Sequence, residues 1–166
     1  MHAKSLRDLG LRDNSISDAG AIDIAKVLCE GSLERLDLAS NGIGAGGVTA
    51  LLLSLSEVRR HGLASCKQRM LKAAAQGADV EALDLSYNNV GNTAAEGLCH
   101  VMRDNPRVLR LVLKECGIEE HGILSLASVL KQSSLTHLDL EGNIGVDSPE
   151  AKKALMNAAL VRGVGA

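Results

Sequence analysis

The amino-acid sequence predicts an α/β solenoid, in which about five short units of strand, turn and helix stack side by side. Three observations predict this fold class. One spacing of apolar residues recurs five times, and each copy joins a two-residue alternation to a turn and further apolar positions. The 166 residues are 46% hydrophobic, yet they include no Trp, no Phe and a single Tyr. A core of Leu, Ile, Val and Ala suits many small, similar layers.

The repeated pattern has three apolar residues at offsets 0, 3 and 5, followed by Asn or Cys at offset 8. The first copy is Leu6, Leu9, Leu11 and Asn14. Units begin near residues 6, 33, 80, 108 and 135, and their Asn or Cys anchors stand at positions 14, 41, 88, 116 and 143. The steps between anchors are therefore 27, 47, 28 and 27 residues. Chance does not hold such a register five times.

This pattern resembles the leucine-rich repeat L-x-x-L-x-L-x-x-N/C-x-L, and Cys116 is an allowed variant at its anchor position. The steps of 27 and 28 residues are similar to those of the ribonuclease-inhibitor-like subfamily. The resemblance covers essentially the whole chain, residues 1–166, as a single domain. It implies a right-handed α/β horseshoe segment, with parallel strands on the concave face and helices on the convex face.

Each unit has a predicted strand, turn and helix. The strands are Leu-x-Leu segments such as Leu9–Leu11, because side chains alternate between the two sides of a strand. The anchor Asn is expected to bond backbone groups of its own turn and of the next repeat. Helix starts are indicated by Thr93 with Glu96 three residues later, and by Ser148 before Pro149. The last helix, roughly residues 149–161, is expected to close the stack.

The step of 47 residues contains about 20 surplus residues, which lie within residues 49–79. This segment is rich in helix formers and is predicted to be one long helix, or two helices broken near His61 and Gly62. It forms a possible second contact for an acidic partner through the basic residues Arg59, Arg60, Lys67, Arg69 and Lys72. The alternative is a solvated helix face, since Lys and Arg are ordinary surface residues.

The concave face is the predicted binding surface. Side chains that alternate away from the core line it, from Asp8, Gly10 and Arg12 in the first unit to His137, Asp139 and Glu141 in the last. Ala39, Ala82, Ser86 and Val112 belong to the same set. The expected partner-binding residues are its charged members and one histidine: Asp8, Arg12, Arg35, Asp37, Asp84, Arg110, Lys114, His137, Asp139 and Glu141. Mixed charge favours a specific protein partner, although a merely solvated face stays open. The scarcity of aromatic anchors predicts modest affinity or a large footprint.

Composition disfavours several other classes of function. The net charge of −2 disfavours nucleic acid and anionic membranes as partners, and apolar runs such as Leu51–Leu53 are far too short to span a bilayer. Four widely spaced cysteines predict reduced thiols and a cytoplasmic protein, with the cytoskeleton and cilia as candidate settings. The histidines and cysteines lack metal-binding spacing, and no cofactor is expected. Gly42–Gly47 matches G-x-G-x-x-G, but it occupies the turn that every unit has.

The sequence therefore predicts a non-catalytic protein-interaction module or scaffold. One alternative is a GTPase-activating protein, because this repeat subfamily is similar to the activators of the Ran GTPase, although this chain ends without their acidic run. Another is a structural subunit that self-associates through its first repeat, which has no cap before Leu6. That uncapped edge also predicts a segment of a longer repeat array, or an edge that another chain covers within a larger complex.

Overall fold

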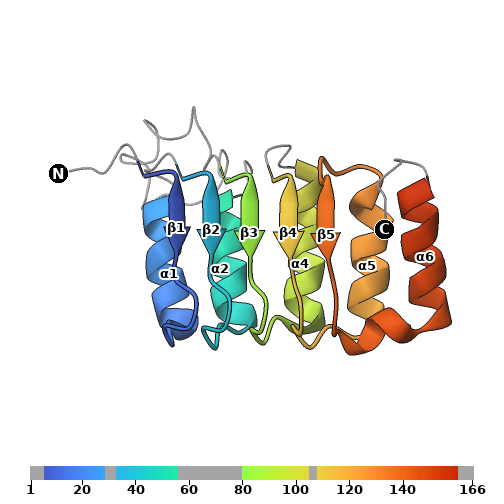
Figure 1. The fold of residues 1–166 in the computed structure, drawn as a ribbon, viewed down its shortest axis with the longest axis horizontal. Helices are drawn as coiled ribbons and strands as arrows, with labels where there is room; N and C mark the ends of the chain where they lie inside the picture. Colours follow the sequence, from blue (N-terminus) through green and yellow to red (C-terminus); the bar gives the residue numbers. More distant parts are fainter. Residues whose placement is uncertain (1–5, 29–32, 56–79, 105–107, 161–166) are drawn as a thin grey trace, which may run out of the picture.

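The computed structural model describes residues 6–28, 33–55, 80–104 and 108–160. It has a layer of parallel strands and a layer of helices that covers one face of the sheet (Figure 1). The strands pair in chain order, β1-β2-β3-β4-β5. They are β1 (Asp8–Gly10), β2 (Arg35–Asp37), β3 (Ala82–Asp84), β4 (Arg110–Val112) and β5 (His137–Asp139). The predicted leucine-rich-repeat solenoid is confirmed.

The helices follow the strands one by one. They are α1 (Ser17–Leu28), α2 (Ala45–Leu55), α4 (Gly91–Asp104), α5 (Glu120–Leu130) and α6 (Pro149–Leu160), with the short 3-10 helix η2 (Ile144–Asp147) before the last. The prediction that a helix begins at Pro149 is confirmed, and the Ser148 hydroxyl accepts a hydrogen bond from the Ala151 N–H at 3.0 Å. The start expected at Thr93 is wrong. Helix α4 begins two residues earlier, directly at Gly91, whose φ is +63°.

The core lies between the two layers and is built from equivalent leucines. The middle residues of the strands are aligned, so that Leu36 lies beside Leu9 on one side and Leu83 on the other. Leu36, Leu83 and Leu111 are each 1–2% exposed. Each repeat contacts its neighbours in the stack, which is how a short unit buries an apolar face that it could not bury alone. The basic insertion predicted within residues 49–79 lies outside the described residues from position 56 onward.

The anchor asparagines form a spine of buried hydrogen bonds. Asn88 donates to the carbonyls of Leu38, Leu85 and Ser86, and its Oδ1 accepts from the backbone amides of Asn41 and Ile43 at 3.1 and 2.9 Å. Asn41 and Asn143 bond in the same way to the repeat before them. The side chains therefore bond their own turn, as predicted. They reach back to the preceding repeat, however, so the expectation that they bond the next one is wrong.

The last repeat folds back on the stack. Gly145 stands where the other turns have an apolar residue, and its N–H donates to the carbonyl of Ile118 at 3.0 Å. A Cβ at this position would overlap the backbone of Glu119 and Glu120, which explains why glycine replaces the apolar residue. Helix α6 then packs against α5 and η2 and buries Ala151 and Ala158. The helix predicted over roughly residues 149–161 is confirmed as α6.

Candidate protein-binding surface

Parallel register arranges the side chains of the concave face in rows across the sheet. The upper row is Asp8, Arg35, Ala82, Arg110 and His137, and the middle row is Gly10, Asp37, Asp84, Val112 and Asp139. A lower row continues just beyond the strands, with Arg12, Ala39, Ser86, Lys114 and Glu141. Neighbouring strands lie about 4.8 Å apart, so neighbours in a row are close enough to interact. The register thus brings together charges that are far apart in the sequence.

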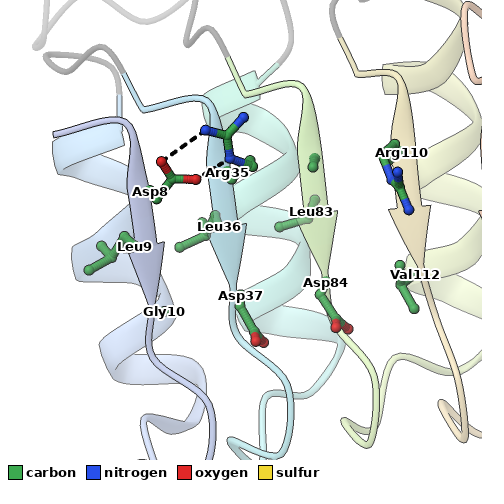
Figure 2. A pocket seen from close by; sticks show the side chains of 11 residues that line it. Asp8, Leu9, Gly10, Arg35, Leu36, Asp37, Leu83, Asp84, Arg110 and Val112 are labelled. Carbon is green, nitrogen blue, oxygen red and sulfur yellow. Dashed lines mark hydrogen bonds and ion pairs between the residues drawn. The ribbon is translucent and has the colours of Figure 1, made fainter.

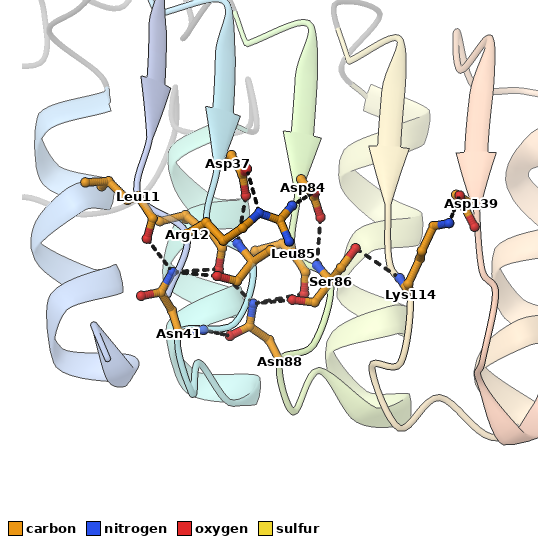
Figure 3. A network of polar contacts seen from close by, with 12 residues as sticks. Leu11, Arg12, Asp37, Asn41, Asp84, Leu85, Ser86, Asn88, Lys114 and Asp139 are labelled. Carbon is orange, nitrogen blue, oxygen red and sulfur yellow. Dashed lines mark hydrogen bonds and ion pairs between the residues drawn. The ribbon is translucent and has the colours of Figure 1, made fainter. Parts of the chain in front are cut away.

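Arg12 joins two carboxylates of the middle row. Its Nε lies 3.2 Å from Asp37 Oδ2, and its Nη2 lies 2.9 Å from Asp84 Oδ2 (Figure 3). Desolvation opposes the charged guanidinium, but the charges of Asp37 and Asp84 outweigh it and raise the pKa of Arg12. Each carboxylate also accepts a backbone hydrogen bond from the residue two places on, Ala39 or Ser86, at 3.0 and 2.9 Å. Both aspartates are therefore held in fixed positions by two kinds of contact.

Lys114 makes a second cluster at the other end of the sheet. Its Nζ lies 2.6 Å from Glu141 Oε2 and 3.0 Å from Asp139 Oδ2. Hydrogen bonds from Lys114 to Glu141 and Asp139 raise the pKa of the lysine. Burial acts to raise the pKa of Asp139. The Glu141 backbone N–H and the Lys114 ammonium lower it by more, so the pKa of Asp139 lies below its usual value.

The upper row contains one bidentate pair. The Arg35 guanidinium binds both oxygens of Asp8, with Nη2 2.9 Å from Oδ2 (Figure 2). This hydrogen bonding lowers the pKa of Asp8. Arg110 and His137 differ from the other charged or titratable residues of the face, because no described residue forms a hydrogen bond or ion pair with their side chains. Arg110 is exposed, and among the permanently charged residues of the predicted binding set it is the one without an ion-pair partner in the described residues.

A shallow hollow of about 310 Å³ lies beside Arg110. It exists because Gly10 and Ala82 carry little or no side chain in rows whose other members are larger. Arg35 and Arg110 flank Ala82, and Asp37 and Asp84 lie one row below them (Figure 2). Its full lining is Asp8, Leu9, Gly10, Arg35, Leu36, Asp37, Ala82, Leu83, Asp84, Arg110 and Val112.

The structure places the ten predicted side chains on one side of the sheet, but it sorts them into two groups. Eight of them are ion-paired: Asp8 with Arg35, Arg12 with Asp37 and Asp84, and Lys114 with Asp139 and Glu141. The side chains of Arg110 and His137 have no such partner within the part of the chain that the structure describes. Ala39 and Ser86, which were expected to line the face, are buried at 0% and 2% exposure. Their small side chains lie beneath the charged ones, and the Ser86 hydroxyl accepts from the Lys114 N–H at 3.3 Å.

Tyr87 is a surface feature that the sequence reasoning missed. Its side chain is 53% exposed, at the turn that follows β3. Tyr87 adopts the left-handed conformation, with φ of 58°, as do Asp13, Ser40 and Glu115 at the same offset of their repeats. The four other copies have a polar residue or glycine at that offset, which indicates a position that faces solvent. This pattern could have predicted that Tyr87 is exposed. Exposed tyrosines are frequent anchors of protein interfaces.

The glycine-rich turn is satisfied from within the protein. The Asp18 carboxylate accepts a hydrogen bond from the Gly44 N–H at 2.6 Å, at the start of α2 where a phosphate would bind. Within the described ranges, no three His, Cys, Asp or Glu side chains are grouped to hold a metal ion. Cys99 and Cys116 are buried free thiols, and burial raises the pKa of each to about 11. They are neutral at physiological pH and poor nucleophiles.

Comparison with known proteins identifies the repeats. A leucine-rich-repeat family model matches residues 2–25, 32–52 and 79–99. Ribonuclease inhibitor from Sus scrofa is 32% identical over 154 residues, and this alignment covers 85% of the chain. The chain belongs to the leucine-rich-repeat proteins of the ribonuclease-inhibitor-like type. The mouse (Mus musculus) protein named NACHT, LRR and PYD domains-containing protein 14 is 31% identical over 137 residues, with 75% of the chain covered.

This leucine-rich-repeat chain spans only part of those relatives: 34% of the ribonuclease inhibitor and 14% of the mouse protein. Two solved structures share its fold. Leiomodin-1 actin-binding site 2 superposes with a TM-score of 0.69 at 13% identity, over 94% of this chain and 80% of that one. The tropomodulin C-terminal domain of Caenorhabditis elegans gives 0.60 at 14% identity, over 94% and 83%. In the described segments, no helix is long and apolar enough to cross a membrane.

Proposed function

We propose that this leucine-rich-repeat chain is a non-catalytic interaction module that binds a partner protein through its concave face. The observation that carries the proposal is Arg110 beside the hollow, which has no ion-pair partner among the described residues, on a face whose other permanent charges are paired. Paired charges are already held in one geometry, so binding need not order them again. Arg110 is the charged residue expected to form the most favourable ion pair with a partner, because no ion pair with a described residue must break first.

The arrangement favours a partner that presents an acidic side chain to the hollow. Strand β3 separates Arg35 from Arg110, so the backbones of these two residues lie about 10 Å apart. A carboxylate placed over Ala82 would therefore lie between the two guanidinium groups. Arg35 is already engaged with Asp8, so Arg110 is the expected donor of a bidentate pair. The half-buried Val112 beside it offers apolar contact. A donor group of the partner would then meet Asp84.

The relatives support this class of function. One is named for inhibiting ribonucleases, and a structure of the same fold is described as an actin-binding site, which are both cases of protein recognition. The chain spans about a third of the ribonuclease inhibitor and 14% of the NACHT, LRR and PYD domains-containing protein 14, so the identity of a partner does not transfer from them. The buried free thiols fit a reducing, intracellular setting. The basic residues within positions 59–72 remain a proposed second contact.

Affinity capture with a matched pair of charge reversals tests the proposal. Arg110→Glu removes a side chain with no described partner, so it should leave the folded chain intact. Lys153→Glu makes the same change in charge on helix α6, away from the concave face. We expect proteins captured by the wild type and by Lys153→Glu to be lost, by tenfold or more, with Arg110→Glu. Equal capture by all three chains would refute binding at the concave face and would direct attention to the basic segment.

A further inference from the structure

Two large apolar side chains are exposed along the edge of the molecule where the strands turn into the helices, at the bottom of the view in Figure 1. Tyr87 is 53% exposed in the turn after β3, and Ile144 is 77% exposed in the turn after β5. We call residues 86–92, 114–120 and 141–148 the turn edge of repeats 3 to 5. An apolar side chain at a solvent-facing position adds to stability only when a second surface covers it.

The exposure of both side chains follows from their positions within the repeat. Tyr87 belongs to repeat 3, which has a full repeat on each side of it. The position of Ile144 is exposed in the three repeats that also have neighbours on both sides, where it is occupied by Gly42, Asn89 and Gly117. A repeat stacked against either side of these units therefore leaves this edge uncovered.

Hydrogen bonds hold the turns of repeats 3 to 5 side by side. The Tyr87 N–H donates to the Lys114 carbonyl at 2.8 Å, and the equivalent residue of repeat 4, Glu115, donates to the Glu141 carbonyl at 2.9 Å. The spacing of the strands thus continues into the turns. The backbones of Tyr87 and of Gly142, its equivalent in repeat 5, therefore lie about 10 Å apart.

The surface between the two apolar side chains is low. Repeat 4 has Gly117 at the position of Ile144, and repeat 5 has Gly142 at the position of Tyr87. The Glu115 side chain lies over Gly142, since a Cβ built on that glycine would be 2.5 Å from Glu115 Oε1. Tyr87 and Ile144 therefore flank a stretch whose charged side chain is Glu115.

The turn edge has an excess of negative charge. It contains five acidic residues and one basic residue, Lys114, which two carboxylates already bind. Within the described residues, three of the five have no ion-pair partner: Glu115, Glu119 and Glu120. The carboxylates of Glu119 and Glu120 accept hydrogen bonds from an amide and a hydroxyl, which are neutral groups and leave the charge uncompensated.

We propose that the turn edge of repeats 3 to 5 is a second docking surface, which binds a segment of a partner protein that carries Lys or Arg beside apolar side chains. The apolar side chains of that segment would pack on Tyr87 and Ile144, and its cation would pair with Glu115. Three or four extended residues span about 10 Å, so one short segment reaches both apolar side chains.

Charge complementarity selects this occupant over others. An acidic segment would meet like charges at Glu115 and at the start of α5. A purely apolar segment would remove water from the Glu115 carboxylate without giving it a partner, which is costly. A segment that offers both a cation and apolar groups satisfies the carboxylate and covers the exposed side chains.

The turn edge is separate from the hollow beside Arg110. Arg110 and Glu115 belong to the same repeat and are five residues apart, which corresponds to about 16 Å of extended chain. The two surfaces also favour opposite charges, since Arg110 favours an acidic side chain. One substitution at each surface therefore distinguishes the two sites.

Selection of displayed random peptides tests the proposal, with the full chain as the target. The library is first depleted on a chain that carries Tyr87→Asn and Ile144→Ser, and is then selected on the wild type. Asparagine adopts the left-handed conformation of position 87 more readily than most residues, so the double variant should fold, which circular dichroism checks. We expect surviving peptides with Lys or Arg beside apolar residues. No survivors, or survivors without basic residues, would overturn the proposal.

The affinities of the surviving peptides show whether both apolar side chains are needed. Fluorescence anisotropy should give at least tenfold weaker binding to Tyr87→Asn and to Ile144→Ser than to the wild type. Met156→Ser removes an exposed apolar side chain on α6 and should bind as tightly as the wild type. Equal binding to all four chains would refute the role of the turn edge.

Charge reversal of Glu115 provides a test that does not depend on the apolar variants. Glu115→Lys should weaken binding of the selected peptides at least tenfold, because their cation then meets an ammonium group. Glu81→Lys makes the same change just before β3, at the opposite end of the strand, and should leave binding unchanged. Arg110→Glu should also bind normally, so the result is independent of binding at the concave face. Unchanged binding to Glu115→Lys, or loss of binding with Arg110→Glu, would contradict docking at the turn edge.

Discussion

Single asparagines hold the turns of this molecule in place. Each buried anchor satisfies backbone groups in two consecutive repeats, and no side chain of another type has both an acceptor and two donors in so small a volume. The repeat of Asn in the sequence predicted its role in the turn, because the residue recurs where a strand ends. The direction of its contacts could not be predicted, since it depends on how one repeat stacks on another.

Asn88→Ala should destabilise the fold much more than Asn14→Ala. Asn88 is 4% exposed, and its loss leaves the Asn41 and Ile43 amides without a described acceptor. The carbonyls of Leu38, Leu85 and Ser86 lose one donor each and keep another. We expect a cost of about 3 kcal/mol, by the usual penalty for unsatisfied buried groups. Asn14 makes one described side-chain hydrogen bond, to the Arg12 carbonyl, so its loss should cost less than about 1 kcal/mol. Urea unfolding of both variants measures the difference, and similar values would contradict the role of the spine.

At the scale of elements, the strands fix which charges meet. Lys114 follows β4, whereas Asp139 ends β5 and Glu141 follows it, and parallel register places the three together. The sequence predicted the strands and the side of the sheet on which these residues lie, because alternation within Leu-x-Leu is a local property. It did not predict that most of these charged side chains form ion pairs with one another. That outcome depends on rotamers and on distances between repeats, which no local pattern encodes.

The Lys114 cluster should make stability depend on acid pH. The pKa of Asp139 is lowered in the folded chain, so its contribution is present above the ordinary aspartate pKa near 3.8 and is lost as pH falls through the lower folded value. Lys114→Met removes one cause of that shift. We expect the loss of unfolding free energy between pH 5 and pH 2 to be smaller in this variant than in the wild type, as measured by urea unfolding at each pH. An equal or steeper loss would show that the pair does not stabilise the folded state.

At the scale of the whole molecule, the chain is a one-dimensional stack with one open sheet face. Five matches to a spacing pattern were sufficient to predict this architecture, because every repeat solves the same packing problem. The residues of the proposed binding surface were predicted from the sequence, but the particular place of Arg110 and of the hollow beside it was not. Arg110 became distinct only when the register left it without a described partner, and the hollow arises from Gly10 and Ala82, which carry no charge to attract attention.

Site-specific photo-crosslinking tests the central claim, that a partner protein occupies the concave face, most directly. A photoreactive residue placed at His137, which stands beside Arg110 in the upper row, would report what touches that face. The same residue at Lys153 on α6 serves as the control. We predict an adduct with another protein from position 137 that is absent from position 153. Adducts with the same protein from position 153 alone, or equally from both positions, would contradict binding at the concave face.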